Sequence, residues 1–202
     1  WRVKAYDNAG NTNNTWSAVW TVILDTAQVV PALLSPVSGA ITNLGNPVFL
    51  WTDESSAASL YWIEIRTNDL SGNVVLSNDG ISAVSPSHQF GSALADGRYA
   101  WRVKAQKSST GLWNAWSASN LLIIDTTAPG SPTSLTPSSG TTSTDATPLF
   151  SWSAPADLNG ISSYEIEIDS VVYTASIDSY TPGALSQASH SWRVRAIDSA
   201  GN

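Results

Sequence analysis

The residues best suited to acid–base chemistry in this sequence are two histidines and a pair of glutamates. His88 and His190 lie far apart, and neither stands in a nucleophile or carboxylate motif. Glu165 and Glu167 in "YEIEI" are two residues apart, so on a β-strand they share a face, like the paired carboxylates of a glycosidase. The alternation places that face in solvent, and no nucleophile-elbow or phosphate-loop spacing occurs. We therefore predict that the protein is not an enzyme.

Basic residues and tryptophans form a second pattern with chemical meaning. In "YAWRVKA" (99–105), alternation places Arg102 and Lys104 on one face, and Trp113 and Trp116 follow in the next predicted strand. A cation over an indole ring gains ~0.5–1 kcal/mol at an exposed site. We predict that these four side chains form a Trp–Arg ladder that stiffens the module. The alternatives are an aromatic strip for sugars and plain core packing.

Trp62 is a further candidate. It faces outward in the predicted strand 61–66, where the aligned position of the next repeat holds Glu165. A neighbouring module or chain that covers Trp62 indicates assembly, whereas exposure in line with other indoles indicates glycan binding. Trp62, Trp113 and Trp116 are therefore candidate interface or ligand residues, although a single exposed aromatic residue also occurs without a function.

Aspartates gather where predicted strands meet linkers. Asp25 and Asp125 end such strands, and Asp7 and Asp198 lie in turns that we expect at the same pole of their modules. Calcium takes six to eight oxygen ligands, and each junction offers only one or two carboxylates. We therefore favour aspartates that cap their own turns, with calcium at the domain junctions as the alternative, and predict no other cofactor.

Composition limits the classes of partner. The 202 residues carry a net charge of −7, which repels nucleic acid and anionic lipid. No apolar run reaches the about 20 residues of a spanning helix. The lack of cysteine excludes disulfides and thiolate metal sites. We predict no nucleic-acid binding and no membrane insertion.

An internal repeat is the strongest signal. "WRVKA" stands at 1–5 and 101–105 and returns as "WRVRA" at 192–196, and "PVFLW" (47–51) answers "PLFSW" (148–152). Phrases that return in the same order along a chain indicate tandem modules. Because the chain opens inside its own repeated phrase, we expect it to be a window from a longer array, in which the missing strand of the last unit follows Asn202. The alternative, which we disfavour, is strand donation between copies.

The repeat divides the chain into three parts. We expect the C-terminal strands of a truncated β-sandwich plus a linker at 1–29, a complete domain at 30–127, and a domain without its last strand at 128–202.

Within each repeat, apolar and polar residues alternate along the predicted strands. In "YWIEIR", Tyr61, Ile63 and Ile65 share one face, which is typical of a strand with one buried side. No segment shows a convincing amphipathic helix. Short strands separated by Gly-, Pro-, Asn- and Ser-rich turns predict an all-β protein of tandem seven-stranded antiparallel β-sandwiches.

These motifs resemble the fibronectin type III family, in the divergent form common in bacterial surface and secreted proteins. The resemblance rests on "PxFxW", "YxIEI" and "LADGRYAWRVKA", and it implies a tyrosine corner of Leu94, Gly97 and Tyr99. The third unit has His190 where that tyrosine is expected, so restoring tyrosine is predicted to stabilise it. "AYDNAGN" and "AIDSAGN" resemble a turn of bacterial Ig-like repeats, and the tryptophan pattern is similar to the Trp–Arg ladder of cytokine-receptor sandwiches.

The linker "DTTAPGSP" (125–132) carries Pro129 and Pro132, which favour an extended, semi-rigid geometry. We therefore expect an extracellular or cell-surface structural protein, a rod or filament segment whose partners are neighbouring repeats or copies of the same protein. The alternative is a binding module, either an adhesin or an accessory domain of a secreted polysaccharide-degrading enzyme. Such a module contacts glycan or a surface protein through exposed aromatic residues.

Overall fold

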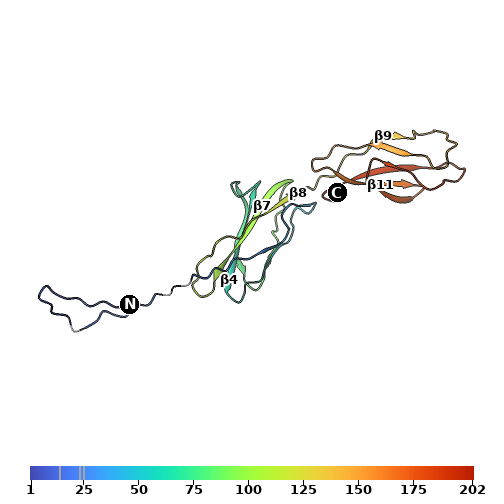
Figure 1. Cartoon of the computed structure of the whole chain (residues 1–202). Coiled ribbons are helices and arrows are strands. Elements are labelled where there is room, and N and C mark those ends of the chain that lie inside the picture. Colours follow the sequence, from blue (N-terminus) through green and yellow to red (C-terminus); the bar gives the residue numbers. More distant parts are fainter. Residues whose placement is uncertain (14, 23, 25) are drawn as a thin grey trace.

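The computed structural model of the chain describes residues 1–13, 15–22, 24 and 26–202. It has fourteen β-strands and no helix in this described part, so the predicted all-β class is confirmed. Two sandwiches follow one another along the chain, and an N-terminal segment extends from the first of them (Figure 1). Among the described residues, no helix is long and apolar enough to cross a membrane.

The first sandwich consists of two sheets with antiparallel pairing throughout, apart from the parallel pair β2–β8. One sheet has the order β1(Leu33–Ser35), β3(Phe49–Trp51), β6(Ser87–His88). The other has the order β2(Ala40–Thr42), β8(Asn120–Ile124), β7(Gly97–Lys107), β4(Ala58–Thr67), β5(Val74–Ser82).

The second sandwich repeats this plan with fewer strands. One sheet has the order β13(Ser179–Tyr180), β10(Phe150–Ser153), β9(Thr133–Thr136). The other has the order β12(Val171–Ala175), β11(Ile161–Ile168), β14(Trp192–Asp198). β14 aligns with β7 of the first sandwich, and it is the edge strand of its sheet.

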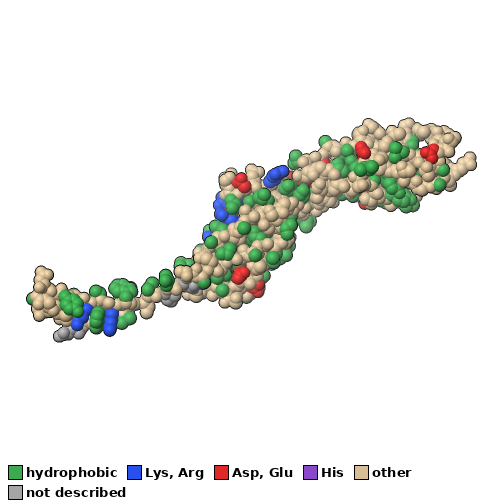
Figure 2. Space-filling model, viewed as in Figure 1, with side chains coloured by type: hydrophobic (Ala, Val, Ile, Leu, Met, Phe, Trp, Pro, Cys, Tyr) green, Lys and Arg blue, Asp and Glu red, His purple; other side chains and the backbone are tan. Residues whose placement is uncertain are grey.

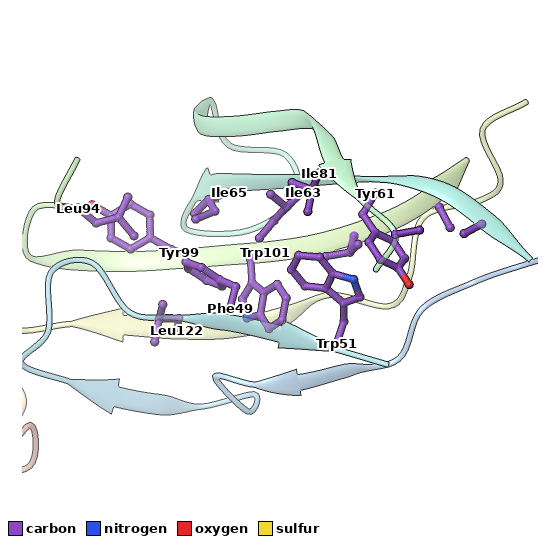
Figure 3. Close-up of a cluster of buried hydrophobic side chains, with 14 of the residues drawn as sticks. Phe49, Trp51, Tyr61, Ile63, Ile65, Ile81, Leu94, Tyr99, Trp101 and Leu122 are labelled. Carbon is purple, nitrogen blue, oxygen red and sulfur yellow. The ribbon is translucent and has the colours of Figure 1, made fainter. Parts of the chain in front are cut away.

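The core of the first sandwich lies between its sheets (Figure 3). Tyr61, Ile63 and Ile65 are fully buried, as their alternation predicts, and Trp51 and Trp101 reach the same layer from the facing sheets. Each such side chain gains about 1.5–3 kcal/mol from burial. The second sandwich has a separate core around Trp152. Each module is therefore stabilised by its own core.

The tyrosine corner is present in the first sandwich, where the Tyr99 hydroxyl donates to the Ala95 carbonyl (2.9 Å). In the second sandwich, His190 Nε2 makes the equivalent contact with the carbonyl of Ser186, also four residues upstream (2.9 Å). The histidine thus retains the corner contact that we expected only tyrosine to restore.

The N-terminal segment forms a narrow ribbon of two extended arms, joined by backbone hydrogen bonds and by the isolated bridge Tyr6–Thr12. Ser17 N donates to the Val3 carbonyl (3.1 Å), and Trp20 N donates to the Trp1 carbonyl (3.0 Å). Its large apolar side chains are exposed, and Figure 2 shows hydrophobic side chains along the surface of this part of the chain. The described residues of the ribbon therefore form no core of their own.

Candidate functional site

The Trp–Arg ladder lies on the outer face of β4 and β7, next to the segment 113–117. That segment lies along the same edge of β7 as β8, because Ser117 N donates to the Val103 carbonyl (2.8 Å) and Asn114 N donates to the Ala105 carbonyl (2.9 Å). Alternation turns the core residues of both strands inward. The basic side chains of β7 are thereby held against the tryptophans on the opposite face.

Lys104 lies at the centre of the ladder. Its ammonium nitrogen is 4.0 Å from the ring centroid of Trp62, 4.6 Å from that of Trp116 and 5.3 Å from that of Trp113. The guanidinium of Arg102 lies 4.4 Å from the centroid of Trp116. All five sequence-predicted site residues are thus brought into one cluster within a single module. Burial in this cluster lowers the pKa of Lys104.

Glu64 joins the ladder from β4, and sequence reasoning missed it. Its carboxylate lies between Arg66 (Nε 2.9 Å) and Arg102 (Nε 2.6 Å) and is only 5% exposed. Burial alone raises the pKa of Glu64, but the hydrogen bonds from the two arginines outweigh it and the pKa falls below its usual value. Alternation placed Glu64 on the outer face, where a glutamate is normally solvated. No local sequence signal indicates its burial, because the register that places Glu64 opposite Arg102 exists only in the folded sheet.

The ring geometry distinguishes a ladder from a flat sugar platform. The ring planes of Trp62 and Trp113 meet at 69°, those of Trp62 and Trp116 at 64°, with centroids 5.6 and 5.5 Å apart. Such edge-to-face packing stabilises the module. Trp62 Nε1 also donates to the Ser77 hydroxyl (2.8 Å). The indole of Trp62 is therefore half-buried and packs edge to face against the tryptophans of its own module.

The N-terminal ribbon repeats part of this arrangement. Arg2 lies 4.4 Å and Lys4 5.7 Å from the ring centroid of Trp16. Trp20 stacks on Trp1, with ring centroids 6.5 Å apart. One cation–tryptophan unit thus forms even outside a sandwich.

The corresponding face of the second sandwich carries salt bridges in place of tryptophans. Arg193 pairs with Glu167 (2.6 Å), and Arg195 pairs with Glu165 (2.7 Å from Nε). These four side chains line a shallow groove of about 420 Å³. Each glutamate therefore has a basic partner, and the two are not arranged as an isolated carboxylate pair.

The linker between the sandwiches is fastened to the first of them by Asp96. One oxygen of its carboxylate accepts hydrogen bonds from Thr126 N (2.8 Å) and Thr126 Oγ1 (2.7 Å), and the other accepts one from the Thr127 hydroxyl (2.6 Å). These bonds, that of the Thr127 hydroxyl foremost, lower the pKa of Asp96. Thr126 and Thr127, the second and third residues of the linker, are thereby held against the first sandwich.

The second sandwich holds the same linker through the turn 198–202. Asn202 Nδ2 donates to the Asp125 carbonyl (2.7 Å), and Asn159 Nδ2 donates to the Asp125 carboxylate (2.7 Å). The buried Asp198 carboxylate orients Asn202 by accepting its backbone and side-chain N–H groups (2.9 Å each). Burial raises the pKa of Asp198, but these hydrogen bonds outweigh that effect and lower it. Residues of both modules therefore converge on Asp125.

The same turn occurs in the N-terminal ribbon. The Asp7 carboxylate accepts Asn11 N (2.8 Å) and Asn11 Nδ2 (2.9 Å). Gly10 has a φ of 84° and Gly201 one of 90°, a conformation that glycine adopts without strain. The motif Asp-x-Ala-Gly-Asn is thus a preformed turn that presents an asparagine amide.

Lys107 occupies the position of Asp198 in the first sandwich, and it also contacts a linker. Its ammonium group donates to the Ala27 carbonyl (2.6 Å), while Ala115 N donates to the side chain of Gln28 (3.3 Å). In both sandwiches, the end of the strand that carries the "WRV" phrase therefore contacts the preceding linker. The contact is made by a lysine ammonium group in the first sandwich and by an asparagine amide in the second.

Three carboxylates, those of Asp125, Asp157 and Asp198, have oxygens within 4.8 Å of one another. These are the described residues best placed to hold a cation, and Asp157 was not foreseen from the sequence. The Asp125 carboxylate also accepts Thr127 N (3.2 Å), which is the turn capping that we favoured. Calcium at the junction stays the alternative, and Asp25 lies outside the described residues.

The two histidines do not form an acid–base pair. His88 lies beside Phe90, with ring centroids 4.5 Å apart, and burial lowers its pKa. His190 belongs to the corner of the other sandwich, where it contacts Asp169. Each histidine thus contacts residues of its own module.

Similarity to solved structures supports the fold. The crystal structure of the FN1–FN3 domains of chicken CNTN1 is similar to this chain with a TM-score of 0.52 and 16% identity. The match covers 86% of this chain and 60% of that chain. No protein-family model and no curated protein matches the sequence. The sheets, the corner and this likeness together define tandem β-sandwich repeats of the fibronectin type III type.

Proposed function

We propose that this chain is a segment of an extracellular rod or filament, in which tandem β-sandwiches act as a structural scaffold of a bacterial surface or secreted protein. The observation that carries the proposal is the junction at Asp125. Asp96 holds the linker from one side, and Asn159 and Asn202 hold it from the other. A linker tied to both neighbours keeps the spacing of the modules, which a stalk requires.

The ladder supports the same role. The aromatic rings and cationic groups of the ladder contact one another. Its members are Trp62, Trp113, Trp116, Arg102 and Lys104. This packing stiffens a module that has no disulfide. Its partners are, on this proposal, neighbouring repeats or copies of the same protein.

The alternative is an adhesin or accessory domain that binds glycan or a surface protein through exposed aromatic residues. A glycan array tests this alternative directly. Binding that is lost in Trp62→Ala, with the fold retained, favours the binding module over the scaffold.

The scaffold proposal is tested by measuring the distance between the two modules. Because the chain has no cysteine, Ser85→Cys and Thr142→Cys place one spin label on each sandwich. We expect a narrow distance distribution by double electron–electron resonance, which Asn202→Ala broadens. Asn11→Ala, in the equivalent turn of the N-terminal ribbon, is the matched control and leaves the distribution unchanged. A broad distribution in the unchanged background contradicts a fixed spacing.

A further inference from the structure

β12 is an edge strand of the second sandwich, and its outer side is unpaired. It is the end strand of the sheet β12-β11-β14, and among residues 26–202 no other strand pairs with it. The N–H and C=O groups along its outer side are therefore a template for a further strand. β12 lies between β11 and β13 along the chain, so both of its neighbours in the sequence are in place.

The strand is straight and firmly held. All five of its residues pair with β11 without a break in register. Asp169 and Ser170, which join the two strands, have φ values of 49° and 68°, and a tight two-residue hairpin turn requires positive values at both positions. The Asp169 carboxylate also accepts the Ser191 N–H (2.9 Å). The free edge is therefore preorganised for pairing.

The devices that usually protect an edge strand are missing from β12. Natural edge strands carry charged residues, proline or β-bulges, which prevent pairing with another chain. Residues 170–177 contain no charged residue, no proline and no glycine. The edge strand β5 of the first sandwich differs, because it pairs with β4 with two shifts in register and contains Asp79 and Gly80. Of these two edges, β12 is thus the one open to a partner.

The exposed side chains of β12 are apolar on both faces of the strand. Val171 is 51% exposed, Val172 55% and Tyr173 37%. The ring of Tyr173 stacks on that of Tyr180 in β13, with centroids 5.2 Å apart and planes at 28°, so it is held at the rim of the sandwich. A strand that pairs with this edge removes apolar surface from water in addition to satisfying backbone groups.

The charges around β12 favour a second copy of this chain as the occupant. The chain carries a net charge of −7, so two copies repel each other unless they meet at a neutral surface. On the outer face beside β12, Glu165 pairs with Arg195 and Glu167 pairs with Arg193. These pairs and the uncharged strand leave no net charge on this face. Two copies can therefore approach there without repulsion, whereas a charged partner finds no counter-charge.

We propose that β12 of one copy pairs antiparallel with β12 of a second copy. Because the two strands are identical, antiparallel pairing about a two-fold axis satisfies the backbone groups of each edge with those of the other. The two sheets become one continuous sheet, and Val172 of each copy lies near Val172 of the other on the outer face. Such a contact uses the same surface on both copies and closes at a dimer. The inference rests on the proposed scaffold role and names the contact by which two rods associate side by side.

Sedimentation velocity of the whole chain over a range of concentrations tests the proposal. We expect monomer to convert to dimer as the concentration rises. Val172→Lys brings like charges together across the two-fold axis, so it is expected to raise the dissociation constant of the dimer about tenfold or more. Val172 is exposed, so this variant leaves the fold intact. Val75→Lys, at an exposed valine of β5, is the matched control and leaves the dissociation constant unchanged.

A mixture of two variants tests whether the copies pair with each other. Val172→Glu alone is expected to weaken the dimer as Val172→Lys does. An equimolar mixture of the two variants is expected to regain association, because opposite charges then lie near each other across the axis. Hydrogen exchange locates the contact, since the amides of β12 are expected to exchange more slowly as the dimer forms, while those of β5 do not change.

Four results overturn the proposal. They are a chain that stays monomeric at all concentrations, a dimer that Val172→Lys does not weaken, a mixture that does not regain association, and protection from exchange that lies outside β12. The distance between the two modules of one chain is measured on labelled chains diluted with unlabelled ones and does not depend on these results. Failure of the dimer and failure of the fixed spacing are therefore separate outcomes.

Discussion

His190 is a residue whose charge is linked to the fold. Its Nε2 contacts the Ser186 carbonyl and its Nδ1 contacts the Asp169 carboxylate. Both partners are acceptors, so the ring is best matched when both nitrogens carry a proton. The contact with Asp169, foremost, and that with Ser186 raise the pKa of His190.

This linkage predicts a pH dependence of the second sandwich. A raised pKa contributes stability that is fully present below the ordinary value of 6.5 and is lost as pH rises through the folded-state value. Urea unfolding of this module is therefore expected to become easier between mildly acidic and mildly alkaline pH. His190→Tyr keeps a hydroxyl for the Ser186 carbonyl but carries no charge, so its stability stays flat over that range. Equal pH profiles for the two proteins contradict the linkage.

At the scale of elements, the ladder joins β4 to β7 on the face away from the core. Glu64 lies under this layer between two arginines. Removing one partner of a buried ion pair leaves the other charges uncompensated.

Glu64→Gln is therefore expected to cost about 3 kcal/mol in the free energy of unfolding of the first sandwich. The aligned variant Glu167→Gln is the matched control, because its partner Arg193 is exposed, and a surface pair contributes about 1 kcal/mol or less. Chemical denaturation of both variants gives the comparison. A similar small loss in both shows that the ladder does not isolate Glu64 from solvent.

The junction yields a prediction on calcium. The carboxylates of Asp125 and Asp198 already accept hydrogen bonds from amide groups. We therefore expect the melting temperature of the chain to be the same in millimolar calcium and in chelator. A higher melting temperature with calcium, lost in Asp157→Asn, identifies a cation at the junction instead.

At the scale of the whole molecule, the two sandwiches have cores that share no residue. Each module is therefore expected to unfold as its own cooperative unit, while the junction couples their orientation.

Trp152→Ala tests this independence. Trp152 is buried in the second core, and loss of a buried tryptophan costs ~3–5 kcal/mol through the cavity that remains. We expect differential scanning calorimetry to show one transition shifted down or lost and the other unchanged. Trp51→Ala is the reciprocal variant and affects only the first sandwich. A loss below about 1 kcal/mol for either variant contradicts a core position.

The sequence alone determined the repeat, the strand faces and the ladder members. Alternation placed Tyr61, Ile63 and Ile65 inward, and the spacing of Arg102 and Lys104 relative to the tryptophans indicated their common face. These features are local, because a strand's side-chain direction follows from its two-residue period and a repeat copies that pattern along the chain.

Only the tertiary structure decided which distant groups meet. The burial of Glu64 and the convergence of Asn159 and Asn202 on Asp125 depend on how strands and modules pack together. Residues separated by tens of positions come within hydrogen-bond distance there, and no local period encodes that placement. His190 shows the same limit, since its alignment was evident from the sequence but its contact with Ser186 required the folded corner.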